Sequence, residues 1–331
     1  KSRDRTSSHQ LADTVRGNNK VLIANSVDYE RDPTSYFGGG GVASIDGKII
    51  SIESGTGNNR NLNTDGEDAV VWSWKAGGSK GTFNASAAAA GLPTQSGSGG
   101  GISVSACSVG TKQGFSIIKY GGGGNGENGI PHGLGRVPKF YIVKNITSGS
   151  SYWTMYHVGM GNTKGIYFDD AAANTNDWWD NTTPTEDLFY VKQASLYVHN
   201  GSDTYISYLW CDVPGLQKFG TYEGNNNSDG PFVELGFNPA IIWTKGVDSS
   251  SHGWEVHYNR GPKLRENPQS ERLMLNESAT IASTNHVDFL SNGFKIRNTF
   301  SGMNSTTDTY IYCAWADVPT VDLYGGGANA R

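Results

Sequence analysis

Two adjacent carboxylate pairs, Asp169/Asp170 and Glu186/Asp187, are the residues of this sequence best suited to acid–base chemistry. Glycoside hydrolysis needs two carboxyl groups that face one cleft, and neighbours in sequence do not by themselves provide this; a structural or solvated loop is the alternative. The hydrolase motifs GxSxG and HExxH and a spaced Cys/His set do not occur in the chain. The sequence therefore predicts a protein that is not an enzyme.

Oxygen ligands for a metal are concentrated in one loop, which carries Asp169, Asp170, Asp177 and Asp180 among asparagines. Such ligands suit Ca²⁺, but their spacing matches no known calcium loop, and a solvated loop is the alternative. The glycine run at 38–41 lacks the Lys-Ser/Thr of a phosphate-binding loop. We expect no cofactor and no assigned metal site, with calcium binding by the Asp-rich loop left open.

The cysteines indicate structural roles. The three cysteines form no CxxC motif, and an odd count argues against a disulfide framework. Cys211 follows Trp210, whereas Cys313 stands two places before Trp315, so the two thiols should point to opposite faces of equivalent strands. We expect all three, including Cys107, to be small buried residues.

The adjacent Trp178 and Trp179 lie in a polar stretch beside Asp177. An exposed indole can stack on the apolar face of a sugar ring, so these three residues are the candidate contacts for a glycan or protein receptor. The alternative is that one or both indoles fold back to anchor the loop. Trp153 and Trp254 occupy matching repeat positions and are expected to lie in the core.

Composition excludes several functional classes. The chain has 331 residues, 45 of them glycine, and a net charge of −5. No basic cluster of the nucleic-acid-binding type is present, and no apolar run is long enough for a membrane span. Many glycines and few long amphipathic segments are typical of short strands joined by turns.

One element organises the chain because it occurs three times, as 65–76, 203–214 and 308–319. A gapless alignment superposes three tryptophans: Trp72, Trp210 and Trp315. Both faces of this element carry bulky apolar side chains, which is typical of a strand buried on both sides. The recurring aspartates Asp65, Asp203 and Asp308 are expected to cap turns through backbone N–H groups.

The repeats predict an all-β protein of tandem β-sandwich-like units. Lys1–Gly17 aligns with Lys245–Gly261, so the first unit is expected to be incomplete at its N-terminus. The expected division is a partial first repeat at 1–78, a Gly/Ala/Ser-rich linker with a lead-in strand at 79–113, a second repeat at 114–217 and a third at 218–331. We expect a loose connection between the first two units and tight packing between the last two.

Several motifs extend along nearly the whole chain. They are Asn58–Asn63 with Val71–Gly78, Gly114–Tyr120, His132–Lys139, Lys218–Gly224, Asp229–Val233, Val287–Lys295 and Thr309–Tyr312. With them the chain resembles a repeat domain of tail fibres and other virion proteins of marine, cyanophage-type bacteriophages. It departs from that pattern at Ala314–Pro319, where an Ala-Phe-Ala-Glu-x-Pro-Phe ending is more common.

The resemblance implies a virion structural protein assembled in the host cytoplasm. It favours a tail-fibre-type adhesin that displays repeated β modules to a host surface glycan or protein, with avidity adding weak contacts. It also implies other virion proteins as partners and a homo-oligomer, with a trimer favoured. The alternatives are a capsid or tail decoration protein that binds only its virion neighbours, and a polysaccharide-degrading tailspike.

Overall fold

The computed structural model describes residues 1–33, 40–45, 49–53, 62–77, 102–122, 129–168, 173–174, 178–192, 195–248, 252–259, 266–269, 271–283 and 285–318. These residues build an all-β protein of antiparallel sheets with one short helix, α2 (Ser301–Asn304). The expected all-β class is confirmed. Most of the expected linker lies outside the described residues. In the part of the chain that the structure describes, no helix is long and apolar enough to cross a membrane.

The second unit has a seven-stranded sheet in the order β11-β10-β9-β8-β13-β6-β5. The strands are β5 (Ser103–Gly110), β6 (Phe115–Gly121), β8 (Phe140–Asn145), β9 (Thr154–His157), β10 (Gly165–Tyr167), β11 (Ala173–Asn174) and β13 (Thr204–Trp210). A second small sheet pairs β7 (Gly129–Pro131) with β12 (Leu188–Tyr190). Residues 195–199 form a turn closed by a Ser195–His199 bridge.

The third unit repeats this plan with a sheet in the order β14-β22-β16-β17-β18-β19. The strands are β14 (Gln217–Glu223), β16 (Pro239–Gly246), β17 (Glu255–Tyr258), β18 (Glu271–Met274), β19 (Ala282–Ser283) and β22 (Thr309–Ala316). Its second sheet contains β15 (Phe232–Glu234), β21 (Gly293–Ile296) and β20 (Val287–Leu290). The repeated strand is β13 in one unit and β22 in the other, and both are buried almost throughout, as predicted.

Among its described residues, the first unit has fewer paired strands than the other two. β1 (Gln10–Leu11) pairs with β2 (Leu22–Ile23), and β3 (Gly41–Ile45) pairs with β4 (Ile50–Glu53). Residues 71–76, the last part of its copy of the repeated element, belong to no sheet among the described residues.

Strand pairing fixes which residues are equivalent in the three units. One set of matching pairs is Ser2–Ala69, Asn145–Tyr205 and Gly246–Tyr310. Counting five residues on from the second member of each pair reaches Trp74, Trp210 and Trp315. The gapless alignment on Trp72 was therefore wrong by two residues. Because side chains of a β-strand alternate between its two faces, a shift of two residues still assigned each side chain to the correct face.

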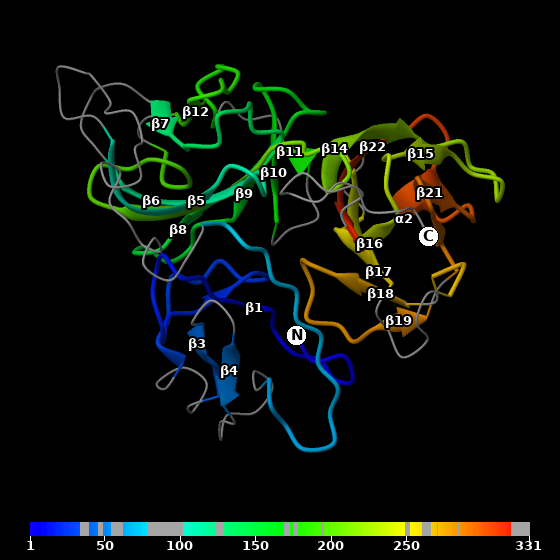
Figure 1. The fold of residues 1–331 in the computed structure, drawn as a ribbon, viewed down its shortest axis with the longest axis horizontal. Coiled ribbons are helices and arrows are strands. Elements are labelled where there is room, and N and C mark those ends of the chain that lie inside the picture. The colour runs from blue at the N-terminus through cyan, green and yellow to red at the C-terminus, as the bar shows by residue number, and fades with distance from the viewer. Residues whose placement is uncertain are drawn as a thin grey trace.

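The three equivalent tryptophans meet at the centre of the molecule. The ring centroids lie 6.3 Å apart for Trp74–Trp210, 5.3 Å for Trp74–Trp315 and 6.1 Å for Trp210–Trp315, all edge-on. Around them one apolar cluster includes residues of all three units, and Figure 1 shows the units side by side around this centre. Trp210 and Trp315 are only 3% and 6% exposed, which confirms them as core residues.

One set of equivalent hydrogen bonds joins each unit to the one before it. The pairing of β1 with β2 follows the same pattern as that of β9 with β10 and of β17 with β18. This common pattern makes three residues equivalent: His9, Trp153 and Trp254. Trp153 Nε1 donates to the Ile23 carbonyl at 3.1 Å, and Trp254 Nε1 donates to the Tyr167 carbonyl at 3.1 Å. His9 Nε2 bonds the Glu277 carbonyl of the third unit at 2.8 Å, which closes the ring.

A second set of contacts runs around the same ring. The equivalent residues are Asp13, His157 and Tyr258, and each meets the repeated strand of the next unit. Tyr208 Oη donates to Asp13 Oδ2 at 2.6 Å. His157 Nε2 donates to the Tyr312 carbonyl at 3.0 Å. The Tyr258 ring packs edge-on against Trp72 at 5.7 Å. The first unit is therefore packed against both of the others, which corrects the expected loose connection.

Each of the two complete units also has a core between its own sheets. Cys107 and Cys211 lie in the core of the second unit, whereas Cys313 lies in the shared central cluster. All three thiols are buried and form no disulfide, as expected, and Cys211 and Cys313 occupy different cores because they point to opposite faces of equivalent strands.

Asp203 has the structural role expected of it, but with different partners. Its carboxylate accepts hydrogen bonds from the side chains of Asn145, Thr147, Ser148 and Asn200, rather than from backbone N–H groups. Although burial opposes the effect, these bonds lower the pKa of Asp203. The network ties the start of β13 to the turn that follows β8.

Candidate functional site

The structure buries both tryptophans expected at the receptor-contact site. Trp178 is 5% exposed and Trp179 is fully buried. Trp179 packs edge-on against Tyr141, with centroids 4.9 Å apart, and its Nε1 donates to the Lys164 carbonyl at 2.9 Å. Neither indole presents an open ring face, so the loop-anchor alternative describes them, and Asp177 lies outside the described residues.

Gly165 explains how Trp178 reaches this position. A Cβ added at Gly165 would lie 2.4 Å from the indole, so the close approach of Trp178 to β10 requires glycine. Trp178 also packs against Tyr167 at 5.0 Å. The sequence signal was the polar composition of the loop, which does not reveal that its aromatic residues point inward.

The other chemical candidates are dispersed. Of the Asp-rich loop only Asp180 is described, and it is exposed. Asp169 and Asp170 lie outside the described residues, and the adjacent Glu186 and Asp187 are exposed. No group of three His, Cys, Asp or Glu side chains among the described residues is placed to hold a metal ion.

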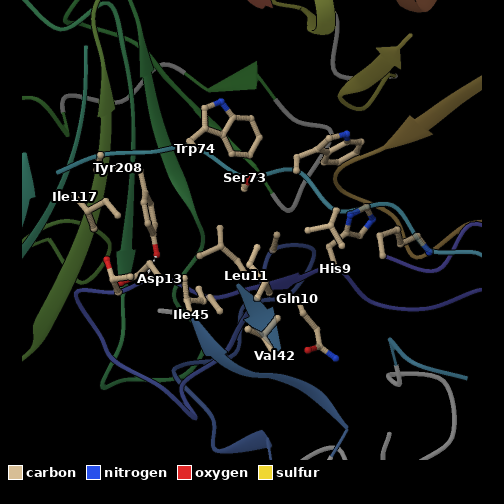
Figure 2. Close-up of a pocket in the computed structure, with 18 of the residues that line it drawn as sticks. His9, Gln10, Leu11, Asp13, Val42, Ile45, Ser73, Trp74, Ile117 and Tyr208 are labelled. Atoms are coloured by element: carbon tan, nitrogen blue, oxygen red, sulfur yellow. Dashed lines mark hydrogen bonds between the residues drawn. The ribbon is translucent and has the colours of Figure 1, made fainter. Parts of the chain in front are cut away.

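A large apolar cavity in the first unit is the site that the sequence did not reveal. Its volume is about 390 Å³. Residues 9–14 form one side and residues 70–76 the other, while Val42 and Ile45 of β3 close it from below (Figure 2). Side chains of the second unit, among them Ile117 and Tyr208, line one end. The cavity thus lies between the first unit's own segments and the shared core.

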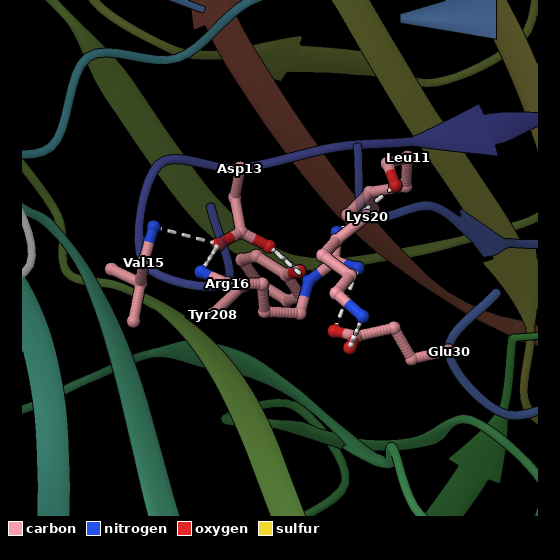
Figure 3. A network of polar contacts seen from close by, with 7 residues as sticks. All are labelled: Leu11, Asp13, Val15, Arg16, Lys20, Glu30 and Tyr208. Carbon is pink, nitrogen blue, oxygen red and sulfur yellow. Dashed lines mark hydrogen bonds and ion pairs between the residues drawn. The ribbon is translucent and has the colours of Figure 1, made fainter. Parts of the chain in front are cut away.

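A buried ion-pair network occupies the end of the cavity near Asp13 (Figure 3). Asp13 Oδ2 accepts from Arg16 Nε at 2.5 Å and from Tyr208 Oη at 2.6 Å. Asp13 Oδ1 accepts from the backbone N–H groups of Val15 and Arg16 at 2.9 and 2.8 Å. Arg16 Nη1 lies 3.5 Å from Glu30 Oε2. The carboxylate of Asp13 is therefore fully engaged, and its bond from Tyr208 joins the first unit to the second.

The electrostatics of this network follow from its burial. The Arg16 side chain is fully buried and that of Asp13 is 4% exposed. Burial alone would lower the pKa of Arg16, but the adjacent Asp13 carboxylate raises it above its usual value. Burial is also the main cause that raises the pKa of Tyr208 well above its usual range, with Asp13 adding to it. The network is a fixed ion pair with a neutral phenol, an arrangement suited to structure rather than to proton transfer.

His9 and Lys1 lie at the opposite end of the cavity. Burial lowers the pKa of His9 to about 3, so the imidazole is neutral at physiological pH. Burial also lowers the pKa of the Lys1 side chain to about 8, and its Nζ donates to the carbonyls of Ser7 at 2.6 Å and Ser278 at 2.8 Å. Both polar ends of the cavity are thus engaged in contacts between units, and the wall between them is mainly apolar.

A second buried polar cluster lies in the third unit. Glu255, fully buried, pairs with Arg272 Nη1 at 2.5 Å. Burial is the main cause that raises the pKa of Glu255, with Arg272 opposing it. His257 is fully buried beside His286, with centroids 5.6 Å apart, and neither ring nitrogen of His257 has a hydrogen-bond partner among the described residues. Burial therefore lowers the pKa of His257 and keeps it neutral.

These features define an all-β protein in which three homologous units share one core and line an apolar cavity. Comparison with protein families shows that the chain belongs to the Domain of unknown function (DUF7483) family, whose model matches residues 1–319. Neither the curated proteins nor the solved structures contain a significant match to the chain.

Proposed function

We propose that this protein is a bacteriophage virion protein of the tail-fibre type, which displays β repeats for attachment to the host surface and is not an enzyme. The observation that supports this best is the ring of three units around one tryptophan core. Such a ring holds three related units in fixed relative positions. Fixed presentation lets weak contacts add, because the second and third binding events become intramolecular.

The use of polar side chains in the core is consistent with a display protein. Asp13, His157 and His9 are each engaged in contacts between units. These contacts join the units and keep the polar atoms concerned in structural hydrogen bonds. The virion location, the homo-oligomeric state and the receptor are carried over from the resemblance to phage virion repeats and are part of the proposal.

Immunogold labelling of intact phage particles with antibodies against this chain tests the location. Label on thin projections from the tail is the expected result. Label spread over the capsid shell would overturn the attachment function and indicate a decoration protein.

A competition assay tests the attachment function directly. Purified chain added in excess should reduce adsorption of particles to host cells, and the same chain unfolded by heat should not. Unchanged adsorption would contradict the proposal. Release of sugar from the host polysaccharide by the purified chain would instead indicate a degrading tailspike. Light scattering of the purified chain will show whether a trimer forms.

A further inference from the structure

Four aromatic rings of the second unit meet where Trp178 is buried. Tyr152 precedes β9, Tyr167 lies in β10 and Tyr197 lies in the turn of residues 195–199. The ring centroids are 4.3 Å apart for Tyr152–Tyr167, 5.8 Å for Tyr152–Tyr197 and 6.1 Å for Tyr167–Tyr197. The Trp178 ring lies 5.0 Å from Tyr167 and 6.0 Å from Tyr197. Three separate segments thus bring three tyrosines together beside one indole.

The cluster has a buried base and a partly exposed surface. Trp178 is only 5% exposed, whereas Tyr152, Tyr167 and Tyr197 are each half-buried. The indole is fixed in place because Gly165 lets it lie directly against β10. Side chains that already rest on a fixed base lose little further freedom when a ligand binds to them. The three tyrosines are therefore preorganised for binding.

The fold of the repeat does not need these tyrosines. Their equivalents in the third unit are Gly253 for Tyr152, Met274 for Tyr167 and Gly302 for Tyr197. The first two follow from the pairing of β9 with β10 and of β17 with β18. The last follows from two matching phenol bonds: Tyr205 Oη donates to the Leu196 carbonyl at 3.0 Å, and Tyr310 Oη donates to the Ser301 carbonyl at 2.6 Å. The third unit keeps the same plan with no aromatic ring at these places, so the tyrosines serve a purpose other than folding.

The chemistry and the size of the cluster suit a sugar ring. An aromatic face packs against the C–H face of a pyranose, while the phenol hydroxyl remains available for polar contacts. Three half-buried tyrosines expose on the order of 200 Å² between them. A stable protein interface needs about 800 Å² from each partner. The exposed area therefore favours a small ligand unit over a protein surface.

We infer that Tyr152, Tyr167 and Tyr197 form a sugar-binding surface, which takes a pyranose residue of the host surface polysaccharide. The inference rests on the proposed attachment function and names the class of its receptor. Trp178 supports the three rings from the protein interior and does not itself contact the sugar.

Binding of the purified full chain to polysaccharide extracted from the host cell surface tests this inference. The polysaccharide is immobilised for biolayer interferometry, either intact or after periodate oxidation, which cleaves the vicinal diols of sugar rings. Tyr152→Ala and Tyr197→Ala each remove one ring at a place where the third unit has glycine, and Tyr197→Phe retains the ring. Phe232→Ala is the matched control, because it removes a 45% exposed aromatic ring from the third unit. Thermal unfolding checks that each variant is folded.

We expect each alanine variant to bind the intact polysaccharide at least about tenfold more weakly than the wild type. Tyr197→Phe should lose less affinity than Tyr197→Ala, and Phe232→Ala should bind as the wild type does. Periodate oxidation should abolish binding. Wild-type affinity in both alanine variants, or equal binding of the oxidised polysaccharide, would overturn the inference.

Hydrogen exchange of the wild-type chain provides a test that does not depend on the folding of any variant. The polysaccharide should slow amide exchange at residues 195–199, and slowing confined to other segments would overturn the inference.

The adsorption assay separates this inference from the proposed function. Wild-type chain that blocks adsorption without binding the polysaccharide would overturn the sugar-binding surface and leave attachment through a protein receptor. Chain that binds the polysaccharide through these tyrosines without blocking adsorption would support the surface and contradict the attachment function.

Discussion

His157 should make the packing between the second and third units sensitive to acid. Its Nδ1 accepts the backbone N–H of Gly159 at 3.0 Å, and its Nε2 donates to the Tyr312 carbonyl of the third unit at 3.0 Å. Both bonds are satisfied only by the neutral imidazole with its proton on Nε2. A second proton on Nδ1 would face the Gly159 N–H, and burial of the ring opposes the added charge.

The magnitude follows from the pKa of this residue. Burial lowers the pKa of His157 from 6.5 to about 4, against a smaller opposing effect of the bond to Tyr312. The pKa of His157 is lower in the folded state than in the unfolded state, so its neutral form contributes fully to stability above the unfolded-state pKa. This stabilisation is lost as pH falls from about 6.5 towards about 4. At about pH 5 the linkage relation gives a loss of about 2 kcal/mol from His157 alone.

The assay is urea unfolding of the wild type and of His157→Gln at about pH 8 and about pH 5. Glutamine retains a donor for the Tyr312 carbonyl but does not titrate. We expect the free energy of unfolding to fall by about 2 kcal/mol less in the variant than in the wild type. His252→Gln is the control, because that ring is only partly buried and should contribute less. An identical pH dependence in His157→Gln and wild type would refute the neutral, buried imidazole.

Three further predictions concern buried contacts. Trp315→Ala should lower the free energy of unfolding by about 3–5 kcal/mol, because it removes one of the three indoles that meet at the centre. Urea unfolding measures this loss, and a loss below about 1 kcal/mol would contradict the shared core. Tyr208→Phe should lower the free energy of unfolding by about 1–3 kcal/mol, because it leaves the buried Asp13 carboxylate without one of its hydrogen-bond donors. An unchanged urea-unfolding midpoint would contradict this prediction. Trp178→Ala should lower the free energy of unfolding by about 3 kcal/mol, because the indole is buried. If the variant kept the wild-type melting temperature, the indole would instead be exposed.

Local sequence pattern was sufficient to predict the repeated strand of the second and third units and its burial. The repeated element has apolar side chains on both faces, and β13 and β22 are buried accordingly. The same period-two logic placed Cys211 and Cys313 in different cores. These features depend on the alternation of side chains along one strand, which a sequence contains directly.

The residues of the candidate site could not be predicted in this way. Trp178 and Trp179 stand in a polar segment, and only the approach of β10 at Gly165 shows that they are buried. The cavity is lined by residues from all three units, so no local pattern indicates it.

The sequence by itself determined that the protein is β-rich, repetitive and built from strands buried on both faces. Tertiary structure alone decided that the units close into a ring, since Trp153, Trp254 and His9 each bond a carbonyl of a different unit. It also decided that Trp74, not Trp72, joins Trp210 and Trp315 at the centre. The physical reason is that strand register and packing between units depend on hydrogen bonds and contacts between residues far apart in sequence.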